Sequence, residues 1–178
     1  GALEVTAKII ECPEDWFRPR QRFTRMKLAE ALDSWVSPRD AAWPKCYVTV
    51  PLDPSWALAE EVGTPAFVSG WMKPDEVLKR QLFLGRDGIS KCHYHSDART
   101  LLTQVVGAKH LVLFPPGDTK WLSPLPWFDV EHCWSRVDFL HPDRSPELTR
   151  TSPYVCSLVA GDALFIPPMM AHGFQTLA

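Results

Sequence analysis

The sequence predicts a mainly β fold, an antiparallel barrel or jelly roll, with helices flanking it on the N-terminal side. Three observations lead to this prediction. β-rich runs dominate from about residue 80 onward, and the double prolines Pro115-Pro116 and Pro167-Pro168 end two of them. Seventeen prolines against nine glycines indicate stiff strand boundaries and few long helices. With 178 residues, 46% of them hydrophobic, the chain is large enough for one domain with a substantial core.

Two helices are predicted in the flanking region, residues 1–79. Residues 28–35 have the apolar spacing of an amphipathic helix. The apolar positions are Leu28, Ala31, Leu32 and Trp35. A second helix is predicted over residues 55–61, because Asp53-Pro54 supplies a cap and a first-turn proline.

The strands of the predicted core, residues 80–178, group around short turns. Residues 101–106 and 109–114, joined by Gly107-Ala108, predict a hairpin. Residues 155–159 and 163–166 predict two further strands around a turn at Gly161-Asp162.

The most informative motif is His95-Ser96-Asp97, followed far downstream by His172. On an extended strand alternate side chains share a face, so His95 and Asp97 are expected to project to the same side. A barrel or jelly roll would bring His172 to the same interior point. Two imidazoles and one carboxylate bind three positions of an octahedral Fe(II) and leave the others open for an oxo-acid and dioxygen. The motif therefore predicts a non-haem iron oxygenase.

The residues around both ligand segments resemble the two signature blocks of the JmjC and cupin-8 hydroxylases. One block runs from His95 to Pro116, and the other is GDALFIPPMMAH at 161–172. Weaker upstream matches in the same order extend the resemblance from about residue 25 to residue 177. These matches are Met26-Lys27-Leu28, Cys46-Tyr47-Val48, Pro51-Leu52, Thr64-Pro65-Ala66-Phe67 and Leu82-Phe83-Leu84-Gly85. The chain is similar above all to the subgroup that contains the asparaginyl hydroxylase acting on hypoxia-inducible factor.

This resemblance implies a double-stranded β-helix that uses Fe(II) and 2-oxoglutarate. It implies that His95, Asp97 and His172 are the catalytic iron ligands, and that the product is a hydroxylated protein side chain, RNA base or small molecule. It allows a homodimer. The family also normally continues past the point where this chain stops, six residues after His172, so the resemblance implies a domain truncated at its C-terminus.

The distal carboxylate of 2-oxoglutarate needs its own anchor, because an unpaired carboxylate is costly to bury. Lys109, twelve residues after Asp97, is the candidate. The resemblance places the family's lysine here, and places a tyrosine for the same carboxylate at Tyr47. The alternatives are a hairpin lysine facing water and an ordinary tyrosine in a half-buried strand.

Three departures from the family pattern leave alternatives open. Cys92 stands where the family usually has a threonine, and a thiol is a weak donor. The spacing from Asp97 to Gln104 is one residue shorter than in the family, and Thr100 or Leu101 replaces the usual asparagine. A shifted register would make His93 the ligand, because His93 would share the face of His95 and Asp97. Met170 and Ala171 replace residues that are often tryptophans. A cupin with other metal chemistry and a non-catalytic metal-binding or interaction module therefore remain alternatives to the hydroxylase.

Net charge and cysteine content limit which binding partners and which cellular compartment are expected. A net charge of −2 gives no general attraction to nucleic acid or membrane. Five cysteines without CxxC spacing indicate neither a disulfide scaffold nor a zinc cluster. No signal peptide or transmembrane span is recognised. We expect a cytoplasmic protein, with a nuclear location also allowed.

Two segments carry open interpretations. The basic residues within 18–27 could bind an anionic substrate or form a solvated arm. The aromatic residues within 121–134 could line a substrate groove or form a satellite core under a long loop.

Overall fold

The computed structural model describes residues 3–12, 20–36, 45–72, 79–86 and 88–177. Arg18 and Pro19 of the basic segment lie outside these residues. The chain forms two compact units. Unit 1 comprises Gly1–Ile9 and Arg22–Gly85, and unit 2 comprises Ile10–Gln21 and Arg86–Ala178. Within the described residues, no helix is long and apolar enough to cross a bilayer.

Unit 1 is built on a four-stranded sheet with the order β2-β1-β3-β4. The strands are β1 (Glu4–Cys12), β2 (Arg20–Lys27), β3 (Lys45–Pro51) and β4 (Gln81–Gly85). Its apolar core contains the buried side chains Val5, Ala7, Ala31, Val48 and Val50.

Three helices accompany this sheet: α1 (Leu28–Val36), α2 (Ala57–Val62) and α3 (Ala66–Trp71). The first confirms the helix predicted over residues 28–35. The second begins two residues later than predicted, and α3 was not predicted. The carboxylate of Asp53 accepts hydrogen bonds from the backbone N–H and the hydroxyl of Ser55, at 2.8 and 2.7 Å. These bonds close a turn ahead of the helix, and Trp56 is the N-cap residue.

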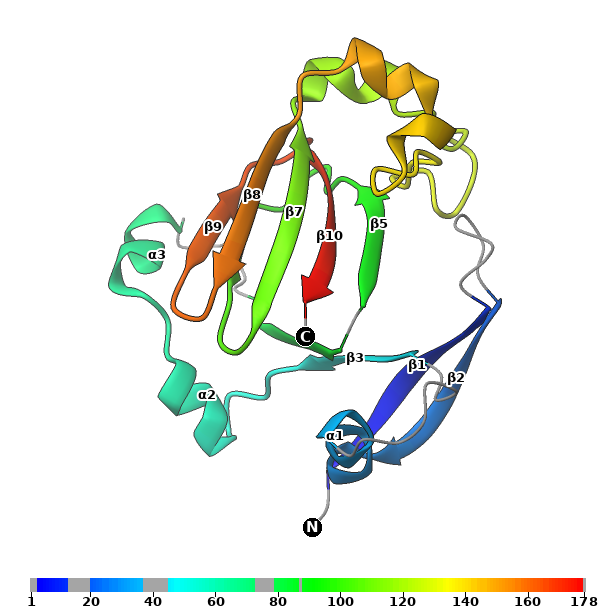
Figure 1. The fold of residues 1–178 in the computed structure, drawn as a ribbon. Helices are drawn as coiled ribbons and strands as arrows, with labels where there is room; N and C mark the ends of the chain where they lie inside the picture. The colour runs from blue at the N-terminus through cyan, green and yellow to red at the C-terminus, as the bar shows by residue number, and fades with distance from the viewer. Residues whose placement is uncertain (1–2, 13–19, 37–44, 73–78, 87, 178) are drawn as a thin grey trace. The chain divides into compact units, whose positions relative to one another are not determined.

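Unit 2 confirms the predicted jelly-roll fold of antiparallel strands. Its strands are β5 (Ile89–His93), β6 (Thr100–Thr103), β7 (Ala108–Phe114), β8 (Tyr154–Val159), β9 (Ala163–Ile166) and β10 (Ala171–Leu177). One sheet has the order β5-β10-β7-β8, and these four strands lie side by side in Figure 1. The other pairs β6 with β9.

The hairpin predicted from residues 101–114 is wrong. β6 pairs with β9, whereas β7 lies between β10 and β8. Gly107 and Gly161 have φ angles of 74° and 98°, which glycine adopts without a Cβ penalty. Each stands in a connection that carries the chain from one sheet to the other, from β6 to β7 and from β8 to β9. Because turn residues mark both a hairpin and a sheet crossing, the local sequence did not distinguish the two.

The two faces of the four-stranded sheet have different neighbours. On one face an apolar core contains Cys92, Phe114, Leu122, Val137, Phe139 and Ala171. Leu122, Val137 and Phe139 come from the connection between β7 and β8. Its 3-10 helices are η1 (Pro116–Trp121), η2 (Pro142–Arg144) and η3 (Pro146–Arg150). The opposite face carries Leu111 and Leu113 of β7 with His172 and Phe174 of β10, because paired residues share a face.

Candidate metal centre

Three histidines meet where β5 ends and β10 begins. His93 and His172 are direct partners in the β5–β10 pairing, and His95 follows two residues after β5 ends. Each histidine offers a ring nitrogen that lies within 4.8 Å of the others. The ring centroids are 4.5 Å apart for His93 and His172, 5.1 Å for His93 and His95, and 5.4 Å for His95 and His172. The structure thus brings together two predicted ligands and the alternative ligand His93.

Backbone carbonyls fix the two more buried rings in the same way. Nδ1 of His93 lies 2.9 Å from the carbonyl oxygen of Lys91, and Nδ1 of His172 lies 3.0 Å from that of Met170. A carbonyl can only accept, so each Nδ1 carries the proton and donates. Each Nε2 therefore has a lone pair available for a metal ion. In metal-binding histidines, the hydrogen bond made by the ring nitrogen that does not bind the metal sets the tautomer and the orientation of the ring.

Burial also keeps these imidazoles uncharged. Desolvation lowers the pKa of His93 to about 4, and the neighbouring charge of His172 adds to the effect. Desolvation likewise lowers the pKa of His172, with a smaller contribution from His95. At neutral pH both rings are neutral, which is the form that binds a metal ion.

Asp97 does not join this group. Strand β5 ends at His93, and Ser96 and Asp97 lie in a bend. The prediction that His95-Ser96-Asp97 occupies an extended strand is therefore wrong, and the alternation that placed His95 and Asp97 on one face does not apply. The Asp97 side chain is exposed, and its carboxylate lies 3.5 Å from the hydroxyl of Ser96. The role of Asp97 as an iron ligand stays a prediction.

The aromatic connection between β7 and β8 borders the cluster. Trp134 stacks on the His93 ring, with centroids 4.6 Å apart and an interplanar angle of 26°. The backbone of Tyr94 donates to the carbonyl of Cys133 at 3.1 Å, which holds the segment against the end of β5. Sequence reasoning did not assign this contact to Trp134, because nothing in the spacing of the two residues signals it.

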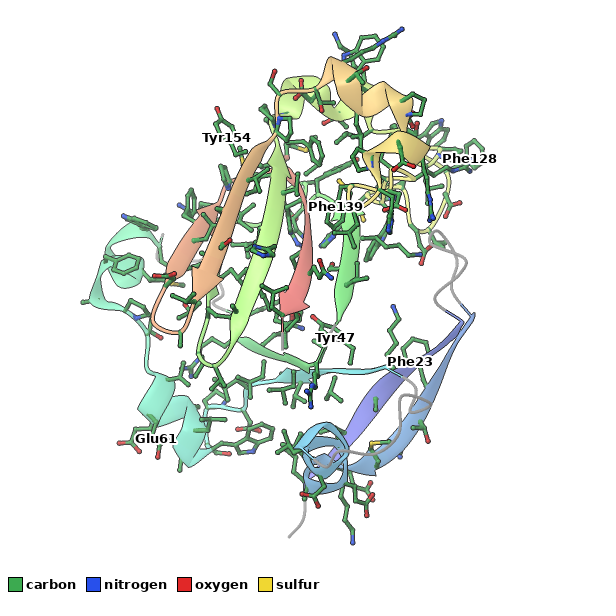
Figure 2. The ribbon with its side chains drawn as sticks, in the orientation of Figure 1. Phe23, Tyr47, Glu61, Phe128, Phe139 and Tyr154 are labelled. Atoms are coloured by element: carbon green, nitrogen blue, oxygen red, sulfur yellow. The ribbon has the colours of Figure 1, made fainter. Side chains whose placement is uncertain are left out.

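The other aromatics of this connection are not a satellite core. Trp127 is 85% exposed and Phe128 is 75% exposed. Figure 2 shows Phe128 at the outside of the connection, away from the strands. Only aliphatic members of the segment, Leu122 and Leu125, are buried.

Lys109 points into the unit rather than into solvent. It lies on β7 opposite Thr176 of β10, and only 5% of the residue is exposed. Its ammonium lies 4.5 Å from the ring centroid of Phe174, on the sheet face that carries His172. Burial lowers the pKa of Lys109 by desolvation. The alternative of a hairpin lysine facing water is thereby excluded, whereas binding of a cosubstrate carboxylate stays a prediction.

The remaining predicted positions, Tyr47 and Cys92, lie outside the histidine cluster. Tyr47 lies on β3 in unit 1, where burial raises the pKa of its phenol far above the usual value. Its predicted contact with a cosubstrate rests on the resemblance alone. Cys92 belongs to the apolar core on the sheet face opposite His93, and burial raises its pKa to about 12. The Cys92 side chain therefore points away from the histidine cluster, because successive residues of a strand face opposite sides of the sheet.

Comparison with known proteins agrees with this architecture. A family model described as "Cupin-like domain" matches residues 15–178. The chain is 32% identical over 101 residues to HSPB1-associated protein 1 of Rattus norvegicus, covering 54% of this chain and 21% of that protein. It is 30% identical over 112 residues to lysine-specific demethylase 8 of Danio rerio, covering 62% and 27% respectively.

A third relative is tRNA wybutosine-synthesizing protein 4 of Gibberella zeae, 31% identical over 121 residues, which are 65% of this chain and 11% of that protein. The chain thus spans 11–27% of the length of these curated relatives. The family model covers parts of both units and far more than half of the sequence. The chain therefore belongs to the cupin-like domain family, the cupin-8 group that its two signature blocks resemble.

Proposed function

We propose that this chain carries the active site of an Fe(II)- and 2-oxoglutarate-dependent dioxygenase that hydroxylates its substrate. One observation carries the proposal: His95 and His172, from distant parts of the sequence, bring ring nitrogens within 4.8 Å of each other. Membership of the cupin-like family and the similarity to a protein named lysine-specific demethylase 8 support it.

The donor set fits a divalent transition metal, because neutral imidazole nitrogens suit iron and its neighbours in the first transition series. His95 and His172 would bind the ion, and the sequence assigns the third position to Asp97. When bound, Fe(II) would allow dioxygen to react with 2-oxoglutarate and the substrate: one oxygen atom would enter a substrate C–H bond to give an alcohol, and the other would enter succinate as carbon dioxide is released. The protein contributes the binding and the orientation of the metal ion and the cosubstrate.

The spacing on the sheet suits a five-carbon dicarboxylate. The Lys109 ammonium lies over Phe174, two residues along β10 from His172. Two residues of a strand span about 7 Å. A 2-oxoglutarate whose oxo-acid end is at the histidines would therefore direct its distal carboxylate toward Lys109, a charge-assisted contact. A second contact from Tyr47 is part of the proposal on the strength of the resemblance only.

We propose a macromolecular substrate, either a protein side chain or an RNA base, ahead of a small molecule. The names of the relatives refer to the protein HSPB1, to lysine and to a tRNA. The finer likeness to the asparaginyl hydroxylase subgroup belongs to this proposal and makes an asparagine side chain one substrate to test. A cytoplasmic or nuclear location is proposed with it; Cys92, Cys133 and Cys156 are free thiols, as a reducing compartment would keep them.

The test is succinate formation from 2-oxoglutarate by protein loaded anaerobically with Fe(II) and then exposed to dioxygen. Wild-type protein is expected to form succinate, and His172→Ala to fall to the background rate. His110→Ala is the matched control, because His110 lies on β7 but is exposed and contacts Ser157. Iron-loaded wild-type protein that forms no succinate would overturn the proposal.

A non-catalytic metal-binding module is the second candidate, and one observation favours it. The predicted carboxylate ligand, Asp97, lies outside the histidine cluster. Tight metal binding together with an absence of succinate would support this candidate over the dioxygenase.

A further inference from the structure

We propose that His93 is a metal ligand in this chain, and that the centre consists of His93, His95 and His172 with no ligand from Asp97. This inference rests on the proposed function in one respect, that the histidine cluster binds a metal ion. The inference goes beyond the proposed function because it assigns three neutral imidazoles as ligands, whereas the sequence predicts two imidazoles and a carboxylate.

The first support is the position of His93 within the cluster. Its ring centroid lies 4.5 Å from that of His172 and 5.1 Å from that of His95, whereas those two rings are 5.4 Å apart. His93 is therefore the nearest histidine to each of the other two. Imidazole nitrogens bind metal ions at about 2.0–2.1 Å, so two nitrogens on one ion are at most about 4.2 Å apart. The ring nitrogens of the three histidines already lie within 4.8 Å of one another, close to that limit.

The second support is the preparation of the His93 ring. It donates Nδ1–H to the carbonyl two residues earlier, the arrangement also found at His172. In both His93 and His172, Nδ1 has this hydrogen-bond partner, whereas Nε2 has none among the residues that the structure describes. A buried acceptor nitrogen without a partner is costly, and a metal ion at the shared point would satisfy both Nε2 atoms at once.

The third support is the rigidity of this position. His93 is the last residue of β5, its backbone pairs with His172, and its ring stacks on Trp134 at 4.6 Å. Asp97 differs, because it lies in a bend after β5 has ended and is not part of the histidine cluster. Fixed ligands lose less conformational entropy on binding than a mobile one. The geometry thus favours His93 over Asp97 as the third ligand.

Replacing a carboxylate by an imidazole changes the charge of the centre. With three neutral ligands, a divalent ion keeps its full charge of two, whereas one carboxylate would reduce it to one. The three-histidine centre therefore attracts anionic, bidentate ligands more strongly, and an oxo-acid is such a ligand. Nitrogen-rich sites also favour cobalt, nickel, copper and zinc alongside iron.

The experiment uses Co(II) as a spectroscopic probe of the whole 178-residue chain. Equilibrium dialysis gives the Co(II) affinity of wild-type protein and of the matched variants His93→Gln and Asp97→Asn, with folding verified by circular dichroism. We expect His93→Gln to weaken Co(II) binding by about tenfold or more and Asp97→Asn to change it by less than about twofold. If Asp97→Asn weakens binding by about tenfold or more, alone or together with His93→Gln, the inference is wrong.

A second measurement needs no variant and so does not depend on the folding of His93→Gln. In the proton NMR spectrum of the Co(II)-loaded wild-type protein, each ligating imidazole contributes one strongly shifted, exchangeable N–H signal. Three such signals are expected, and two would overturn the inference while leaving the proposed function intact. Three signals without succinate formation by the Fe(II) form would overturn the dioxygenase alone, whereas failure to bind Co(II) would overturn both.

Discussion

At the scale of single residues, Lys109 offers the sharpest test of the cosubstrate. Lys109→Met keeps most of the apolar part of the side chain but removes the charged ammonium, so the distal carboxylate of 2-oxoglutarate would lose its partner. We expect the Kd of 2-oxoglutarate, measured by calorimetry on metal-loaded protein, to rise by about tenfold or more, since charge-assisted hydrogen bonds contribute about 1.5–3 kcal/mol. Metal affinity is expected to stay unchanged.

The matched control for this prediction is Lys120→Met. Lys120 is exposed and lies over the Trp121 ring in η1. Its replacement should leave the Kd of 2-oxoglutarate as it is. Equal affinities of the Lys109→Met and wild-type proteins would remove Lys109 from the binding site.

Asp138 has a structural role that stability measurements can reveal. Its buried carboxylate accepts hydrogen bonds from the backbone N–H groups of Leu140 and His141, at 3.2 and 3.1 Å, and contacts the His141 ring at 3.0 Å. Asp138→Ala leaves these donors without their acceptor. We expect a loss of about 1–3 kcal/mol in the free energy of unfolding, measured by urea denaturation. Asp143→Ala, at an exposed position of η2, should change it by less than about 0.5 kcal/mol.

Among the site residues, the sequence predicted those that a motif marks. His95 and His172 were found because both lie in recognisable blocks, and the cluster contains both. His93 entered only as an alternative, because an HxD pattern assumes an extended strand and the chain bends at Ser96 and Asp97. The stacking of Trp134 on His93 depends on the path of a long connection, which no local pattern encodes.

At the scale of elements, strand β10 lies close to the connection between β7 and β8. Residue 173 of β10 therefore has to be small, because Phe139 of that connection packs against it. A Cβ added at Gly173 would lie 2.3 Å from Cε1 of Phe139, whose ring packs in the apolar core. Figure 2 labels Phe139 beside the four-stranded sheet that contains β10. Gly173→Ala is therefore expected to lower the free energy of unfolding by about 1–3 kcal/mol, as overpacking does.

Two controls test this explanation by the same denaturation measurement. Gly117→Ala should have little effect, because a Cβ there meets nothing within 4 Å. Adding Phe139→Leu to Gly173→Ala should cost less than the sum of the two single changes, since the smaller side chain relieves the clash. Strict additivity would show that the Phe139 ring is not the cause.

The strands themselves were predictable, but some of their pairings were not. β8 and β9 lie where the β-branched runs and Gly161-Asp162 placed them. Their neighbours are β7 and β6, because the turn joins two sheets rather than two paired strands. Pairing depends on contacts between distant segments, whereas turn residues report only the local backbone. α3 was missed for a similar reason, since six residues give too short a periodicity.

At the scale of the whole molecule, the buried histidines make the stability of the metal-free protein depend on pH. The pKa of His93 is lowered from 6.5 to about 4 in the folded protein, so below pH 6.5 the unfolded chain binds the proton first. Stability is therefore complete above about pH 6.5 and falls as the pH decreases toward 4. The loss from His93 is about 3 kcal/mol.

Urea denaturation of EDTA-treated protein between pH 4 and 7 measures this dependence. Carboxylates also titrate in this range, so the comparison with His93→Gln isolates the part due to His93. The variant is expected to show the weaker pH dependence. Identical pH profiles of the two proteins would contradict the assigned pKa.

We also propose that residues 1–178 form one domain, since the family match at residues 15–178 includes parts of both units. Calorimetry should then show a single unfolding transition whose calorimetric and van't Hoff enthalpies agree. Two separate transitions would instead assign an independent fold to each unit.

The central claim is that one divalent metal ion binds where His95 and His172 meet. Anomalous diffraction from crystals grown with Mn(II), an air-stable substitute for Fe(II), tests it most directly. We predict one strong anomalous peak within bonding distance of the Nε2 atoms of His95 and His172. A peak elsewhere in the molecule, or a pair of imidazoles with no peak between them at saturating Mn(II), would contradict the claim.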